Sequence, residues 1–433
     1  MIVALLFCAF IVFMLIGVPV GVALGVAGTA AIILSNLDVQ WFGLLAVPQS
    51  FYAGLAKYPL LAIPMFVLVG SIFDRSGVAS RLVNFAVALV GRGPGMLPLV
   101  AISVAMFLGG ISGSGPACAA AVGAVMIGAM SRAGYPPSFS ASVVAAGAAT
   151  DILIPPSIAL IIYSILVPQA SVPAMFAAGM VPGILAGLGL IIPAVWLSRK
   201  HKLGALESGL PRPPFWASLY AAAWGLSAPV LILGGMRLGF FTPTEAAVVA
   251  VFYGLFIGMF VHRTIKVQDL FIILREAAEL SAVIMLIVTL AGIFAWALST
   301  LSVIDPITRA IVNSGLGEYG VLALIIALLM VVGMFLDGIS IFLIFVPLLL
   351  PIAQAYQWDV VWFGIVMTLM VAVGQFTPPL AVNLMVSCRI ARVPMESTVK
   401  WVLWLVLGMF AVLLLVVAFP PLALWLPQYL GYS

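Results

Sequence analysis

Long apolar segments alternate with short polar, glycine-rich or proline-rich interruptions along most of the 433 residues. Such runs are typical of helices that cross a bilayer, because a hydrocarbon core of about 30 Å requires about 20 apolar residues per helix. A chain of this length has room for about 10 to 14 hydrophobic elements, and it contains no long hydrophilic stretch. We therefore predict an all-α, polytopic membrane protein with no separate extramembrane domain.

A short motif recurs in the second half of the chain. FLGGIS at 107–112 returns as FLDGIS at 335–340. Each copy is followed by an apolar segment that a proline pair interrupts, GAATDILIPPS at 147–157 and GQFTPPLAVN at 374–383. Weak duplications of this kind are typical of secondary transporters, whose binding sites lie between repeats on discontinuous helices.

Two apolar arms flank each copy of the motif. In the first copy the arms have about 13 or 14 residues, too few to cross the hydrocarbon core. We therefore predict two re-entrant helical hairpins, over 92–132 and 318–357, whose tips face a site. The proline pairs predict broken transmembrane helices over 138–167 and 360–388.

The distribution of basic residues orients the two hairpins. Arg92 and Arg132 lie at the feet of the first hairpin, whereas the feet of the second contain no Lys or Arg. By the positive-inside rule, the first hairpin enters from the cytoplasmic side and the second from the periplasmic side. The sequence thus predicts two inverted repeats with scaffold helices, at 1–198 and 215–433, a cytoplasmic linker at 199–214 and a final crossing at 401–427.

The composition agrees with this architecture and excludes several functions. Hydrophobic residues make up 65% of the chain and charged residues 7%, against about 45–50% and 25% in soluble domains. The net charge of +4 reflects topology in such a protein and does not indicate nucleic-acid binding. Because the sequence shows no HExxH, GxSxG or phosphate-binding loop, we expect no enzyme activity, no cofactor and energy from an ion gradient.

The hairpin tips and helix breaks are the candidate binding elements. Interrupted helices expose backbone carbonyls, which suit Na⁺, and amides, which suit a carboxylate. Small residues allow close approach of the backbone, and hydroxyl groups complete an oxygen shell. The first predicted cluster is Ser112, Gly113, Ser114, Thr150, Asp151 and Pro155, and its pseudo-symmetric partner is Asp337, Gly338, Ser340, Gly374, Thr377, Pro378 and Asn383.

Structural roles compete with these assignments. The glycines and serines at the first tip also suit close helix packing. Asp151 and Asp337 are either functional carboxylates within the membrane or caps at the breaks, and proton coupling through either remains an alternative to Na⁺. For Asp74 and Glu245 we expect an interfacial position and a structural or capping role.

Six motifs together resemble a known family. They are IPMFVLVGSIF at 63–73, FLGGISGSGPA at 107–117, DILIPPS at 151–157, FFTPTEAA at 240–247, FLDGIS and GQFTPPLAVN. In these stretches, which are short but span nearly the whole chain, the sequence resembles the large membrane subunit of the tripartite ATP-independent periplasmic (TRAP) transporters, within the ion-transporter superfamily of elevator proteins.

The resemblance implies a Na⁺-coupled importer of organic acids in the bacterial cytoplasmic membrane. It implies a periplasmic substrate-binding protein and a small four-helix membrane subunit as partners, and a mobile domain that carries both hairpins and moves as an elevator. We expect the small subunit to be a separate chain. The family's Na⁺ sites map onto Ser112, Gly113, Ser114, Asp337, Gly338, Thr377 and Pro378.

Other functions remain open at this point. A stand-alone Na⁺/dicarboxylate carrier of the same superfamily would need no partner. A passive channel would show flux without Na⁺ coupling, and hairpins that enter from both sides favour alternating access over an open pore. A membrane enzyme is disfavoured because the sequence shows no catalytic constellation.

Overall fold

The computed structural model describes residues 2–35, 42–90, 93–207 and 213–432. Every regular element in these ranges is a helix. Eight of the described helices are long and apolar enough to cross a membrane. The prediction of an all-α, polytopic membrane protein is therefore confirmed. Arg92 at the predicted hairpin foot and residues 208–212 of the predicted linker lie outside the described ranges.

The two halves of the chain have the same order of elements. Each contains a helix pair, a crossing, a short helix, a hairpin, a broken helix and a long helix. The first half consists of α1 (Ile2–Leu15), α2 (Val20–Ser35), α3 (Phe42–Leu55), the 3-10 turn η1 (Tyr58–Leu61), α4 (Ala62–Arg75), α5 (Val78–Val90), α6 (Met96–Ser112), α7 (Gly115–Arg132), α8 (Pro137–Ala148), the 3-10 turn η2 (Ala149–Ile152), α9 (Ile158–Leu166) and α10 (Val172–Lys200).

The second half repeats this order with two differences. Its crossing is the single 34-residue helix α13, where the first half has α3 and α4, and a short helix follows its last crossing. Its elements are α11 (Phe215–Arg237), α12 (Pro243–Phe256), the π-helical turn η4 (Ile257–Val261), α13 (Val267–Thr300), α14 (Ile304–Val312), α15 (Gly317–Gly333), α16 (Gly338–Ala355), α17 (Val360–Phe376), α18 (Val382–Ala391), the 3-10 turn η5 (Met395–Thr398), α19 (Val399–Ala418) and α20 (Pro421–Tyr429).

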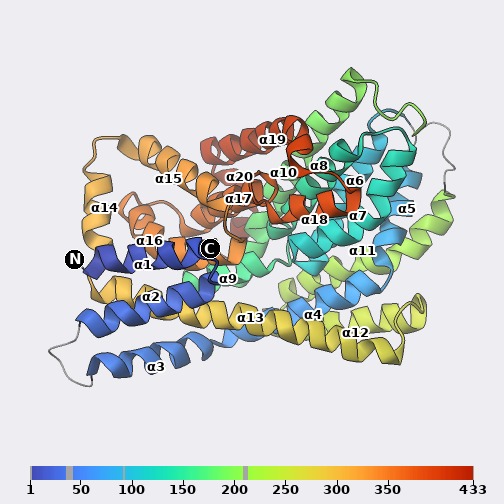
Figure 1. The fold of residues 1–433 in the computed structure, drawn as a ribbon. Coiled ribbons are helices and arrows are strands. Elements are labelled where there is room, and N and C mark those ends of the chain that lie inside the picture. The colour runs from blue at the N-terminus through green and yellow to red at the C-terminus, as the bar shows by residue number, and fades with distance from the viewer. Residues whose placement is uncertain (1, 36–41, 91–92, 208–212, 433) are drawn as a thin grey trace.

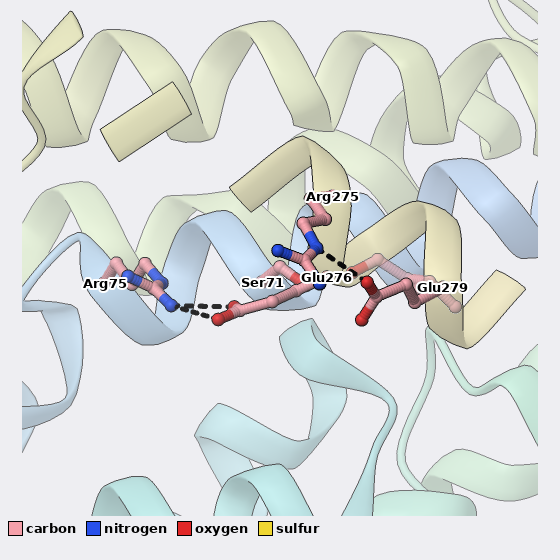
Figure 2. Close-up of polar contacts among 6 residues, drawn as sticks. Ser71, Arg75, Arg275, Glu276 and Glu279 are labelled. Carbon is pink, nitrogen blue, oxygen red and sulfur yellow. Dashed lines mark hydrogen bonds and ion pairs between the residues drawn. The ribbon is translucent and has the colours of Figure 1, made fainter. Parts of the chain in front are cut away.

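Helices α1–α4 and α11–α13 form what we call the scaffold layer. In Figure 1, α2, α3, α4, α12 and α13 run side by side along the lower part of the molecule, and α13 packs against α2, α3 and α4. Figure 2 shows Arg75 of α4 paired with Glu276 of α13, with Nη2 2.6 Å from Oε1, beside the Arg275–Glu279 pair along α13. Both pairs are solvent-exposed, where ion pairs contribute little to stability; apolar packing holds the layer together.

The broken helices occupy the centre of the remaining elements. Every residue from Phe139 to Ala148 in α8 is buried, as is every residue from Trp362 to Gly374 in α17. In Figure 1 the hairpin α6–α7 lies on the right of this core and the hairpin α15–α16 on the left. The two hairpins thus approach the broken helices from opposite sides.

The hairpin arms are longer than predicted. Helices α6 and α7 have 17 and 18 residues. In α6, helical hydrogen bonding continues through Gly109–Ser112, part of the motif that we predict to lie between the two arms. The Gly113 amide donates to the Gly109 carbonyl at 2.8 Å. Gly113 then ends α6 with a φ of 62°, a left-handed conformation that favours glycine. The turn of this hairpin is therefore only Gly113–Ser114.

Glu245 has the structural role that we expected. It caps α12, because its Oε2 accepts hydrogen bonds from the amide and the hydroxyl of Thr242, both at 2.8 Å. Thr242 Oγ1 in turn accepts from the Glu245 amide, which completes a capping box. Asp74 makes no such cap: its Oδ1 is buried without a partner among the described residues.

The linker after α10 is tied to the foot of the first hairpin. The Glu207 side chain is 3% exposed; its carboxylate accepts hydrogen bonds from the Leu97 amide at 2.8 Å and from the Tyr135 hydroxyl at 2.6 Å. The Tyr135 hydroxyl also accepts from the Gly95 amide at 2.7 Å. Burial raises the pKa of Glu207 above its ordinary value of 4.5, although these hydrogen bonds oppose the shift.

We expect Tyr135→Phe to destabilise the protein by about 1–3 kcal/mol, because it leaves the buried Gly95 amide without an acceptor and removes a donor to Glu207. The thermal unfolding midpoint of the purified protein measures this loss. Tyr220→Phe is the matched control, since Tyr220 is 75% exposed. Equal midpoints for the two variants would contradict the proposed tie.

The raised pKa of Glu207 also predicts a pH dependence. Its contribution to stability is complete below the ordinary pKa of 4.5 and is lost as the pH rises through the raised value in the folded state. Between pH 4.5 and pH 8, the unfolding midpoint of the unmodified protein should therefore fall relative to that of Glu207→Gln. A difference that is constant or grows in the opposite direction would refute the assignment.

Candidate ion- and substrate-binding site

Both hairpin tips open onto one cavity of about 190 Å³. The two predicted clusters therefore contribute to a shared site, which the two broken helices and α13 complete. Its lining comprises Gly113, Ser114, Gly115 and Pro116 from the first hairpin, Asp337, Gly338 and Ile339 from the second, Asp151, Ile152, Ile158 and Ala159 from the first broken helix, Gln375 and Val382 from the second, and Leu280 and Ile284 from α13.

The first tip lies close to α4 of the scaffold layer. A Cβ added at Gly70 of α4 would lie 2.7 Å from the Ser112 carbonyl oxygen, so only glycine permits this approach. Ser112 is 1% exposed, and its hydroxyl oxygen has no hydrogen-bond partner among the described residues. The tip thus has a buried oxygen that is free to interact with a ligand.

The glycines that precede the tip make room for the first break. A Cβ at Gly109 would lie 2.6 Å from Asp151 Cβ, and one at Gly110 would lie 2.9 Å from Ile154. Close packing is therefore one role of this motif, as its small residues also suggested. The carboxylate of Asp151 is fully buried, and neither oxygen has a partner among the described residues. Asp151 thus makes none of the hydrogen bonds expected of a cap.

Asp337 at the second tip does act as a cap. Its Oδ2 accepts a hydrogen bond from the Ser340 amide at 3.2 Å, and its Oδ1 accepts one from the Ser340 hydroxyl at 2.5 Å. These bonds start α16 and fix the carboxylate at the edge of the cavity. A cap that lines the cavity keeps lone pairs available, because each carboxylate oxygen accepts more than one hydrogen bond.

The second break is joined to the first tip. Asn383 Nδ2 donates to Gln375 Oε1 at 2.9 Å, and a Cβ at Gly115 would lie 2.6–2.7 Å from atoms of this amide pair. Asn383 Oδ1 is buried without a partner among the described residues. One tip therefore packs directly on the broken helix of the other repeat.

The remaining predicted residues are not part of the cavity lining. Thr150 and Thr377 use their hydroxyl groups to bond the Gly147 and Val373 carbonyls, at 2.8 and 2.6 Å. These threonines shape the helix ends and are not free to face a ligand through their hydroxyl protons. The predicted residues absent from the lining are Ser112, Thr150, Pro155, Ser340, Gly374, Thr377, Pro378 and Asn383.

Sequence reasoning missed two parts of the site. Gln375 lies inside the GQFTPPLAVN motif beside Gly374, and its position as the polar residue before the break was the signal available. Leu280 and Ile284 gave no signal, because nothing distinguishes them from the other apolar residues of α13. Leu280 and Ile284 supply the apolar part of the cavity lining that comes from α13.

The chemistry of the cavity suits small hard cations. Its lining contains two carboxylates and no Lys, Arg or His. Buried oxygens without partners lie on or next to it, on Ser112, Asp151 and Asn383. Oxygen ligands of this kind suit alkali and alkaline-earth ions, whereas the described residues hold no group of three or more His, Cys, Asp or Glu side chains for a transition metal.

Comparisons with known proteins identify the family of the chain. Residues 7–422 match the model of the family described as the tripartite ATP-independent periplasmic transporter, DctM component. The chain is 36% identical to the C4-dicarboxylate TRAP transporter large permease protein DctM of Pseudomonas aeruginosa, with 95% of both chains covered. It is 34% identical to the sialic acid TRAP transporter large permease protein SiaM of Vibrio cholerae, with 96% of both covered.

Two further comparisons bear on chain length and fold. The isethionate TRAP transporter permease protein DctMQ of Oleidesulfovibrio alaskensis is 36% identical over 97% of this chain, which spans 65% of that relative's length. Among solved structures, the YdaH transporter of Alcanivorax borkumensis has the same fold, with a TM-score of 0.65 at 13% identity over 89% of this chain and 91% of YdaH.

The family match spans nearly the whole chain, and the eight apolar helices are those of a multi-pass protein of the bacterial inner membrane. The chain therefore belongs to the DctM family, the large permease subunits of TRAP transporters.

Proposed function

We propose that this chain imports organic acids across the inner membrane by Na⁺-coupled secondary active transport. The observation that carries the proposal is the shared cavity at the two hairpin tips, with its buried oxygens that lack partners. Two carboxylates without a basic residue repel an anionic substrate. Cations bound there neutralise the carboxylates, which couples anion binding to cation binding.

In this proposal the tips and breaks bind the ions. Backbone carbonyls at the interrupted helices, together with Ser112, Gly113, Ser114, Gly338 and Thr377, contribute oxygen ligands, and Pro378 contributes its carbonyl. Asp151 and Asp337 supply the charge. Burial of Asp151 without a protein partner supports its role, because an ionised group at this depth is costly unless a cation pairs with it.

The apolar wall of the cavity supports an elevator movement of the hairpins and broken helices relative to α13. On the scaffold side, Leu280 and Ile284 of α13 form that wall. Apolar contacts are non-directional, so hairpins and broken helices slide along α13 without breaking a fixed set of hydrogen bonds there. The direct contact between the first tip and Asn383 supports movement of both repeats as one body.

We further propose two partners, a periplasmic binding protein and a small membrane subunit. The names of the relatives, which identify them as large permease proteins of TRAP transporters, support this assembly. The DctMQ relative, of which this chain spans 65%, supports a second membrane component. Substrates named for the relatives include C4-dicarboxylates, sialic acid and isethionate, so the proposed substrate class is small organic anions.

Uptake into proteoliposomes tests the proposed function. With the small subunit, the binding protein and an inward Na⁺ gradient present, we expect accumulation of at least one of succinate, N-acetylneuraminate and isethionate. Omission of Na⁺ or of the binding protein should abolish it. Accumulation by this chain alone would favour the stand-alone carrier, and downhill flux indifferent to Na⁺ would favour a channel.

Asp151→Asn tests the ion site directly. We expect the Na⁺ concentration for half-maximal uptake to rise about tenfold or more, since the variant removes a charge that pairs with the cation and such interactions contribute about 1.5–3 kcal/mol. Asp305→Asn, on the exposed helix α14, is the control. If the Na⁺ dependence of uptake is unchanged while its pH dependence shifts, Asp151 binds a proton and not Na⁺.

A further inference from the structure

A lysine lies in the scaffold layer beside the C-terminal half of α13. Lys57 stands between α3 and α4, and it lines a small cavity together with Val288, Ala291 and Ala295 of α13. These α13 residues lie near the middle of the apolar stretch between the Arg275–Glu279 pair and the end of the helix at Thr300.

Lys57 also lines the wall of a second and much larger cavity, of about 500 Å³. This cavity lies between the scaffold layer and the segment that joins α9 to α10, with Tyr58, Ser164, Pro168 and Ser171 in its wall. We call it the Lys57 cavity. It has the volume of a site for a small organic molecule, about 300–1,000 Å³ in known proteins.

The charge of the Lys57 cavity is the opposite of that at the tips. Its lining contains Lys57 and no Asp or Glu. The Lys57 ammonium group donates to the Ile165 carbonyl at 3.4 Å, a long bond to a neutral acceptor. Helix α10 begins at the wall, at Val172, and the positive end of its dipole adds to the field. The cavity thus attracts anions.

Helix α9 connects this cavity to the ion site. Ile158 and Ala159 at its start line the cavity at the hairpin tips, and Ser164 and Ile165 near its end line the Lys57 cavity. At 1.5 Å per residue, the two are about 10 Å apart along α9. An anion at Lys57 would therefore lie close to cations bound at the tips.

We propose that Lys57 binds a carboxylate or sulfonate group of the transported anion in this cavity, as a position that the anion occupies next to the ion site. The inference rests on the proposed function and adds to it a residue that recognises the substrate. A lipid phosphate carries similar chemistry, but the position of this cavity about 10 Å along α9 from the ion site favours the transported anion.

Acetylation of Lys57 by N-succinimidyl acetate tests binding without any need for transport. The rate at Lys57 is followed by peptide mass spectrometry in phosphatidylcholine vesicles that contain the permease complex, with succinate, N-acetylneuraminate or isethionate as probes. We expect at least one probe to slow acetylation of Lys57 about tenfold or more, while the exposed Lys266 in the same sample reacts at an unchanged rate. No protection by any probe, or protection only by added phosphatidylglycerol, overturns the proposal.

Uptake by substituted permeases gives the second test. Lys57→Gln should raise the KM for the transported anion about tenfold or more, whereas Lys57→Arg keeps it within about threefold because the charge remains. Lys266→Gln is the matched control and should behave as the unmodified protein. An unchanged KM in Lys57→Gln, with uptake by the unmodified protein intact, refutes this inference alone, whereas a lack of uptake by the unmodified protein refutes the proposed function.

Discussion

The fold depends on how two helices are interrupted inside a membrane. A break frees backbone groups that the hydrocarbon core has no water to solvate, so protein contacts or ligands must satisfy them. Ser157 Oγ bonds the Ile152 carbonyl at 2.8 Å in the first break, and the Leu380 amide bonds the Met334 carbonyl at 3.3 Å in the second. The first break is buried at the centre of the molecule, whereas Leu380 in the second is 45% exposed.

Close approach of backbones then determines which residues are allowed around the breaks. Glycine at 70, 109 and 115 lets the first hairpin tip contact α4, its own break and the Asn383–Gln375 pair. A Cβ at any of these positions would lie within 2.7 Å of a neighbouring atom. These glycines thus bring the tip, the first break and the amide pair together, and the packing leaves buried oxygens of Ser112, Asp151 and Asn383 without partners among the described residues.

The apolar runs, the proline pairs and the repeated motif predicted the architecture, because each is a local feature that can be recognised in the sequence. They also identified Asp151, Asp337 and both tips. They did not show that the tips share one cavity, that Asp337 caps α16 while Asp151 has no partner, or that α6 extends to Ser112. Those properties arise from contacts between segments far apart in the chain, as does the position of Lys57 beside the C-terminal half of α13.

The two repeats place their single carboxylates at different positions, and steric exclusion explains the difference. Gly109 and Asp337 are equivalent in the repeated motif, and Asp151 and Gly374 each lie four residues before the first proline of a pair. A side chain at 109 would collide with Asp151, and one at 374 would lie 2.5 Å from the Gly333 carbonyl. Each repeat therefore has space for one acid, on the break in the first and on the tip in the second. This arrangement brings two carboxyl groups to one cavity without forcing two carboxyl groups of the same repeat into contact.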